Sequence, residues 1–181
     1  MTDEFQAAAA ALIEAGRFLF GRGWVPATSG NFSARLGDGR LALTVSGRHK
    51  GRLATEDILL ADAAGNSLDG RRPSAETALH VQIYRHFPDV GCVLHPHTVN
   101  ATLLSRLAPD GVELQDYELL KAFPGVDSHA CRVTVPVFRN DQDIARLATR
   151  VDRWMSDHTP VYGYLIDDRI VVNRFDYFDA N

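Results

Sequence analysis

The stretch Val93-Leu94-His95-Pro96-His97-Thr98 decides how this chain folds and where its chemistry lies. It completes an apolar run that is typical of a buried strand, and in a strand residues i and i+2 point to the same face. His95 and His97 are therefore expected to present two imidazoles side by side, with Pro96 stiffening the backbone between them. This spacing suits a divalent transition metal such as zinc, although a pair alone lacks the remaining ligands of a metal site. The alternative is a pair of surface histidines at a strand end.

The composition is that of one globular domain. The chain has 181 residues, 45% hydrophobic and 23% charged, so a single domain with a sizeable core is expected over residues 1–181. The net charge of −4 argues against a nucleic-acid-binding protein. No apolar run approaches the roughly 20 residues that span a bilayer, and the acidic N-terminus is the wrong start for a secretory signal. Cys92 and Cys131 make no disulfide framework, which favours the cytoplasm.

Hydrophobic spacing predicts a mixture of helices and strands. Because these elements do not alternate strictly as β-α-β units, we expect an α/β architecture with a central, largely antiparallel sheet flanked by helices. Ser74 is the expected N-cap of the second helix. Helices are expected at residues 3–20, 74–86, 100–106 and from 141 onward. Strands are expected at residues 31–35, 41–45, 90–95, 133–138, 161–166 and 170–172, with an ambiguous stretch at 114–122.

Two polar clusters have the features of anion-binding loops. Residues 28–33 read T-S-G-N-F-S and residues 44–51 read T-V-S-G-R-H-K-G, so each combines small hydroxyl side chains with a glycine. Glycine permits close approach of the backbone, and the amide and hydroxyl groups around it can donate to an anion. Either cluster alone is also typical of an ordinary turn. Two of them, with Arg48 and Lys50 in the second, favour a phosphorylated substrate.

Two acids and one histidine are candidates for proton transfer. Glu76 lies in P-S-A-E-T-A-L-H, where it either takes part in chemistry or only favours a helix N-terminus. His80 follows four residues later on the same helical face, and such a histidine is more often packed or solvated than a ligand. Glu118 lies in Q-D-Y-E-L-L-K. It is either a proton acceptor beside a polarised carbonyl or part of a solvated helix face.

Taken in this order, the motifs resemble those of the class II aldolase and adducin-like superfamily over residues 5–166. Within it the chain resembles the methylthioribulose-1-phosphate dehydratases of methionine salvage. The H-P-H and P-S-A-E motifs place only the superfamily, whereas Y-E-L-L-K-A and N-D-Q-D-I point to the dehydratase branch. The resemblance implies a class II aldolase-like three-layer fold, one zinc ion per subunit, a small phosphorylated ketose as substrate and a homotetramer.

The resemblance also implies roles for individual residues. His95 and His97 match the two strand-borne zinc ligands. Glu118 matches the catalytic acid of the dehydratases, and Glu76 matches the acid that serves as base and occasional metal ligand in the aldolases. Four further positions match residues that hold the substrate phosphate: Asn31, Ser46, Gly47 and Ser74.

The C-terminal segment is divergent and short compared with the family pattern. The family's third zinc histidine lies in a segment resembling G-Y-L-I-D-G-H-G, and the chain reads G-Y-L-I-D-D-R-I there, so Arg169 stands at that position. Arginine stays protonated and does not ordinarily ligate zinc. The third ligand is then Glu76, His129 or His158, or the metal is held poorly. The chain also stops at Asn181, short of the family's usual last helix.

The leading hypothesis is a zinc-dependent lyase that removes water from a phosphorylated ketose. A Lewis acid would polarise the C2 carbonyl, a carboxylate would remove the C3 proton, and the C4 hydroxyl would leave as water. The same site can cleave or epimerise sugar phosphates, so a class II aldolase or epimerase is the enzymatic alternative. The second alternative is a non-catalytic adducin-like domain with a degenerate metal site. Arg169 favours it, whereas the retention of both imidazoles and both acids disfavours it.

Overall fold

A seven-stranded sheet forms the centre of the computed structural model, which describes residues 2–123, 125–158, 161–167 and 169–172. The strands are ordered β3-β2-β1-β4-β9-β8-β7, and every neighbouring pair is antiparallel except β7 and β8. The predicted central, largely antiparallel sheet is therefore confirmed. The strand bounds are β1 (Asn31–Arg35), β2 (Leu41–Thr44), β3 (Ile58–Ala61), β4 (Cys92–His95), β7 (Val137–Phe138), β8 (Gly163–Ile166) and β9 (Arg169–Val172).

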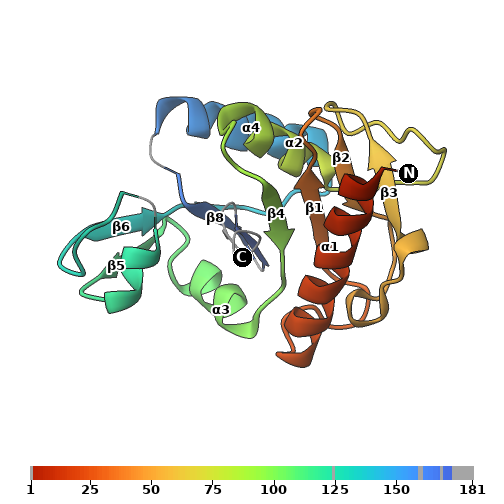
Figure 1. Cartoon of the computed structure of the whole chain (residues 1–181). Coiled ribbons are helices and arrows are strands. Elements are labelled where there is room, and N and C mark those ends of the chain that lie inside the picture. Colours follow the sequence, from red (N-terminus) through yellow and green to blue (C-terminus); the bar gives the residue numbers. More distant parts are fainter. Residues whose placement is uncertain (1, 124, 159–160, 168, 173–181) are drawn as a thin grey trace.

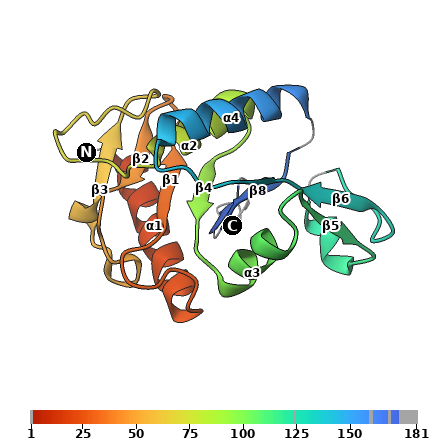
Figure 2. The same cartoon turned by 180° about the vertical axis from the view of Figure 1, so that it is seen from behind.

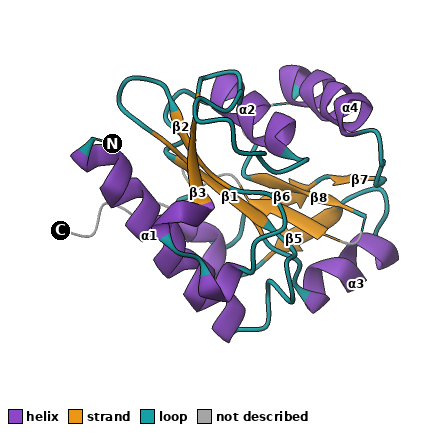
Figure 3. Ribbon diagram, turned by 90° about the vertical axis from the view of Figure 1, so that its right-hand side faces the viewer, coloured by secondary structure: helices purple, strands orange, loops and turns teal. Residues whose placement is uncertain are grey.

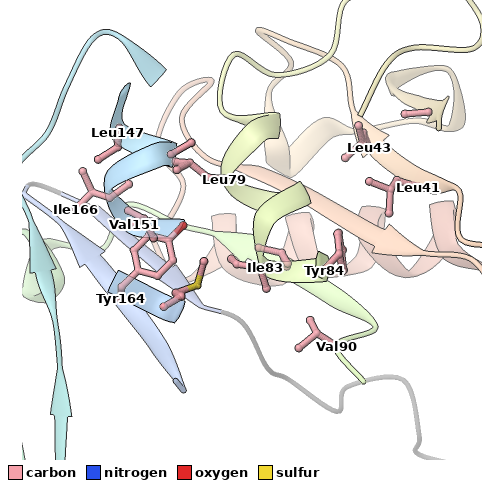
Figure 4. Close-up of a cluster of buried hydrophobic side chains, with 14 of the residues drawn as sticks. Leu41, Leu43, Leu79, Ile83, Tyr84, Val90, Leu147, Val151, Tyr164 and Ile166 are labelled. Carbon is pink, nitrogen blue, oxygen red and sulfur yellow. The ribbon is translucent and has the colours of Figure 1, made fainter. Parts of the chain in front are cut away.

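Helices cover both faces of this sheet, which gives three layers (Figures 1 and 3). On one face lie α2 (Thr77–His86) and α4 (Ile144–Asp157), and on the other lie α1 (Asp3–Gly21) and α3 (Val99–Leu107). Side chains alternate across the sheet, as the strand pleat requires: Leu41 and Leu43 pack toward α2, whereas Ala42 packs toward α1. The face under α2 and α4 holds a large apolar cluster that includes Ile83, Leu147 and Tyr164 (Figure 4).

Local sequence explains where the helices begin. Thr2 caps α1 by accepting a hydrogen bond from the Phe5 amide, and acidic residues in the first turn favour the helix dipole. The expected N-cap at Ser74 is wrong, because α2 starts at Thr77 and Glu76 occupies the cap position. Ser74 instead uses its carbonyl to accept from the Thr77 amide in the turn that precedes the helix. No helix among the described residues is long and apolar enough to cross a membrane.

A small second sheet, absent from the sequence expectations, lies at the end of the molecule away from α1 (Figures 1 and 2). It pairs β5 (Val112–Gln115) with β6 (Arg132–Val135), and between them lies the 3-10 helix η3 (Glu118–Ala122). The single strand expected at residues 133–138 is divided at Pro136, because proline cannot donate to a ladder. Sequence reading also missed β3 and the short 3-10 helices η1 (Lys50–Arg52) and η2 (Thr55–Asp57).

Candidate active site

The two histidines lie where β4 ends. Only three residues connect β4 to α3. The last of them, Thr98, caps the helix by accepting a hydrogen bond from the Ala101 amide. His95 is completely buried, and His97 is half-buried with its amide donating to the Trp24 carbonyl at 2.7 Å. The two imidazole rings lie nearly parallel, with centroids 5.1 Å apart. The side-by-side arrangement expected from the i, i+2 spacing is therefore present.

Glu76 and Asn31 fix the orientation of the buried histidine. Asn31 lies opposite His95 in the β1–β4 ladder, and its Nδ2 donates to Glu76 Oε2 at 2.7 Å. The same carboxylate oxygen is 3.1 Å from His95 Nδ1. A carboxylate at Nδ1 favours the proton there and leaves the Nε2 lone pair for a ligand. His95 Nε2 is buried and has no hydrogen-bond partner among the described residues.

These atoms fit a zinc site in part. Neutral imidazole nitrogen is a preferred zinc ligand, and a carboxylate on the far ring nitrogen is the usual outer-shell partner of a metal-bound histidine. A buried nitrogen without a partner is costly unless a ligand satisfies it. Within the described ranges, however, no group of three His, Cys, Asp or Glu side chains is positioned to hold a metal ion.

The proposed sources of a third ligand lie in different places. Glu76 contacts His95, whereas His158 stacks on Trp154 at the end of α4 and His129 lies 3.8 Å from Glu118. The backbone at Arg169 begins β9, whose ladder with β4 pairs Val172 with Leu94. Continuing that antiparallel register places position 169 opposite His97, although the side chain at 169 lies outside the described residues.

A pocket of about 370 Å³ opens beside the histidines. Glu76 and His97 line it together with all four residues expected to hold phosphate. Ser29 also lines the pocket, and its buried hydroxyl has no hydrogen-bond partner among the described residues, so it is available to a ligand. The lining residues are Thr28, Ser29, Gly30, Asn31, Ser46, Gly47, Ser74, Ala75, Glu76, His97, Gln142 and Ile144.

The Asn31 side chain also contacts Glu76 and the buried histidine. Its amide nitrogen donates to Glu76 and lies 3.4 Å from His95 Nδ1, which carries the proton in this arrangement and therefore does not accept from Asn31. Its Oδ1 is buried without a partner among the described residues. An oxygen acceptor is a poor contact for a phosphate, and in this arrangement the Asn31 side chain therefore positions Glu76.

Glu118 does not line this pocket. It begins η3, and its side chain is 72% exposed and paired with Lys121 Nζ at 2.5 Å. The hydrogen bond from Lys121, reinforced by that residue's positive charge, lowers the pKa of the Glu118 carboxyl. Of the two acids predicted from the sequence, therefore, only Glu76 lies beside the histidines of its own chain.

A polar network behind the pocket was not predicted. Ser33 Oγ lies 2.7 Å from both His80 Nδ1 and Tyr84 OH, and all three side chains are buried. Burial lowers the pKa of His80 to about 3, so this histidine is neutral. His80 is therefore packed, as the commoner interpretation held. The i, i+4 spacing from Glu76 was the only signal that could have placed it near the site.

Comparisons with known proteins agree with this arrangement. Residues 10–167 match the model of the class II aldolase and adducin N-terminal domain family. A methylthioribulose-1-phosphate dehydratase from Methylococcus capsulatus is 66% identical over 90% of this chain and 80% of its own length. One from Pseudomonas paraeruginosa is 59% identical over 92% of this chain and 82% of its own length.

Solved structures share the fold. YgbL from Klebsiella pneumoniae, described as a putative aldolase/epimerase/decarboxylase, superposes with a TM-score of 0.80 at 24% identity. The match covers 96% of this chain and 81% of that one. An L-fuculose 1-phosphate aldolase superposes with a TM-score of 0.75 at 23% identity, covering 92% of this chain and 74% of that one.

Proposed function

Since this chain belongs to the class II aldolase and adducin family, we propose that it is a zinc-dependent dehydratase of methionine salvage. The reaction converts 5-methylthioribulose 1-phosphate to 2,3-diketo-5-methylthiopentyl 1-phosphate and water. One observation supports this most strongly: two glycine-hydroxyl loops, suited to a phosphate, share one pocket with Glu76 and His97. The names of relatives at 59–66% identity support the choice of substrate.

The chain's own residues divide the work. His95 and His97 would hold zinc, which when bound supplies a Lewis acid for the substrate carbonyl. Asn31 and Glu76 keep the His95 ring in one tautomer and orientation. Ser29, Ser46 and the nearby backbone bind the phosphate and so fix the sugar in the pocket.

Glu118 is the proposed proton-transfer group. Its carboxylate takes the proton at C3 and gives it to the C4 hydroxyl, which leaves as water, and the C3 enol that results ketonises at C4 to the diketone. Because Glu118 is exposed and outside the pocket of its own chain, it would act in the pocket of a neighbouring subunit. The sequence resemblance to a homotetrameric family supports this arrangement.

Exposed apolar side chains on α3 and η3 support an assembly. Val99, Leu103 and Leu107 on α3 are 54–80% exposed, and Leu119 beside the acid is 83% exposed. Large exposed apolar side chains gathered on neighbouring elements mark a protein interface. A second copy of this chain is the occupant that would also bring Glu118 to a pocket. A cytoplasmic location completes the proposal, and the free thiols Cys92 and Cys131 are consistent with it.

A class II aldolase or epimerase remains the second candidate, because the acid that lines the pocket is Glu76. Product analysis separates the two. Zinc-loaded protein incubated with 5-methylthioribulose 1-phosphate should yield a product that has lost one water by mass spectrometry. Cleavage into two fragments would support an aldolase, and a product of unchanged mass with a new stereocentre would support an epimerase.

A further inference from the structure

Lys50 joins the two loops of the pocket from behind. Its side chain is only 2% exposed, and it does not line the pocket. The Nζ atom donates to the carbonyl of Thr28 at 3.0 Å and to the carbonyl of Arg48 at 2.6 Å. The first carbonyl belongs to the loop of residues 28–30, and the second follows the loop of residues 46–47. One ammonium group therefore holds both loops in a fixed relation.

Each loop contains a left-handed residue, and a strained one precedes the first loop. Ala27 has φ +53°, a left-handed conformation that is unfavourable for a residue with a Cβ. Gly30 and Gly47 have φ +76° and +73°, within or beside the loops. Left-handed turns of this kind direct backbone N–H groups into a concave surface, which is a common way to bind an anion.

The lysine itself is held in place by α1. A Cβ at Gly16 would overlap the Lys50 carbonyl oxygen, and a Cβ at Gly51 would lie 2.5 Å from the Phe20 ring. The 3-10 helix η1 is thus packed directly on α1. Lys50 is therefore a fixed point from which the loops are held.

The charge of Lys50 is maintained by nearby acids. Burial lowers its pKa to about 8, and the charges of Asp57 and Glu76 oppose that decrease. Asp57 also pairs with Arg48 at 3.1 Å. At neutral pH the group is therefore mostly an ammonium ion, buried next to a pocket that would bind an anion.

We propose that Lys50 is a positioning residue for the substrate phosphate: it clamps the loops at 28–30 and 46–47 together and places a positive charge behind them. This proposal rests on the proposed function, because it assumes that the anion in the pocket is a phosphate. A role as a Schiff-base nucleophile does not fit, because Lys50 is outside the pocket lining and donates to two carbonyls.

The test measures the binding of inorganic phosphate to the intact protein by calorimetry. Lys50→Met keeps the length of the side chain but removes the charge and the donors. It should weaken phosphate binding by about 10- to 100-fold, the range for hydrogen bonds made by charged groups. Arg52→Met removes a positive charge from an exposed side chain in the same 3-10 helix, and should leave phosphate affinity within about twofold.

A second variant guards against a failure to fold. Lys50→Gln retains one neutral donor and should also lose at least about tenfold in phosphate affinity, because the charge is gone. With substrate, both variants should raise KM more than they lower kcat. A purely structural role would lower Tm without raising KM more than it lowers kcat.

The possible results distinguish the two proposals. If wild type binds phosphate and Lys50→Met or Lys50→Gln binds it equally well, the role of Lys50 is wrong and the proposed function stands. If Lys50 variants lose phosphate but wild type shows no dehydratase activity, the clamp is supported and the proposed function fails. If wild type does not bind phosphate at all, the pocket assignment and the clamp are both overturned.

Discussion

The two candidate acids lie in opposite environments, one in the η3 segment and one in the inner wall of the site, formed by Asn31, Glu76, His95 and His97. Glu76 is 8% exposed and bound by Asn31 beside a buried histidine, whereas Glu118 is exposed and pairs with a surface lysine. A buried, hydrogen-bonded carboxylate is well placed to orient another group. An exposed carboxylate such as Glu118 can reach a bound substrate only if the pocket of another subunit lies against it. Under the proposed function, positioning and proton transfer would belong to different parts of the molecule, which would meet across a subunit boundary.

Removing either imidazole should have the largest effect. His95→Ala or His97→Ala should abolish zinc retention and with it dehydratase activity, a loss beyond the 10- to 100-fold typical of outer-shell changes. Atomic absorption on the purified variants measures the metal. His158→Ala, at the distant end of α4, should keep its zinc. Unchanged zinc in both His95→Ala and His97→Ala would overturn the site.

Amide substitutions should separate the two acids. Glu118→Gln should lower kcat by about 10²- to 10⁴-fold with zinc and substrate still bound, since the amide cannot take a proton. Glu76→Gln should cost only about 10- to 100-fold, because it weakens the orientation of His95. Steady-state kinetics measures both. The reverse ranking would favour aldolase-type chemistry with Glu76 as the base.

Glycine at position 30 supports the inner wall. A Cβ at Gly30 would lie 2.6 Å from the His95 carbonyl oxygen, and its φ is +76°. Gly30→Ala should lower the free energy of unfolding by at least about 3 kcal/mol, from strain plus overlap. Gly23→Ala is the matched control, because Gly23 has φ +72° but open space around it, and should cost about 1 kcal/mol. Equal losses in urea denaturation would show that the contact with His95 is unimportant.

Raising the pH should weaken binding of the substrate phosphate. It should not lower the contribution of Lys50 to the free energy of unfolding. With a pKa of about 8 in the folded protein and 10.5 ordinarily, Lys50 loses its proton first in the native state. Between these values the unfolded chain binds more protons, so the contribution of Lys50 to stability rises with pH. KM for the substrate should nevertheless rise about tenfold from pH 7.5 to 9.5. The charged side chains that face Lys50 are the carboxylates of Asp57 and Glu76.

Restoring a histidine at position 169 should have the smallest effect. Arg169→His should strengthen zinc retention by about tenfold against a chelator of known affinity, because continuing the β4–β9 register beyond the Leu94–Val172 pair would bring that position opposite His97. Arg169→Lys is the control and should not strengthen it. Equal zinc affinity in wild type and Arg169→His would mean that another residue already completes the site.

The local sequence pattern was enough to predict the residues of the inner wall but not the long-range hydrogen bonds that position them. The i, i+2 spacing placed His95 and His97, and the glycine-hydroxyl clusters placed the loops, because both signals are local. The contacts of Asn31 with Glu76 and of Lys50 with Thr28 join residues 45 and 22 positions apart. No periodicity encodes such long-range pairs, so the sequence suggested a phosphate contact for Asn31 and only general charge for Lys50.

The η3 segment was the harder region to predict for a related reason. Residues 114–122 combine apolar and charged neighbours that suit a strand, a helix or an interface, and the structure divides them between β5 and η3. Two of the large side chains there, Tyr117 and Leu119, are exposed in the single chain, whereas Leu120 is buried. Their exposure suits burial against another copy of the chain. A prediction made for a monomer does not anticipate such burial.

Complementation between inactive subunits tests most directly whether the inner wall and Glu118 meet across a subunit boundary. His97→Ala and Glu118→Gln, each inactive alone, are co-expressed with different tags and the mixed oligomer is assayed for dehydratase activity. Activity should return, because a subunit that lacks Glu118 can receive that acid from its neighbour. His95→Ala with His97→Ala, both in the inner wall, should stay inactive. A mixed oligomer of His97→Ala and Glu118→Gln as inactive as its parents would contradict the shared site.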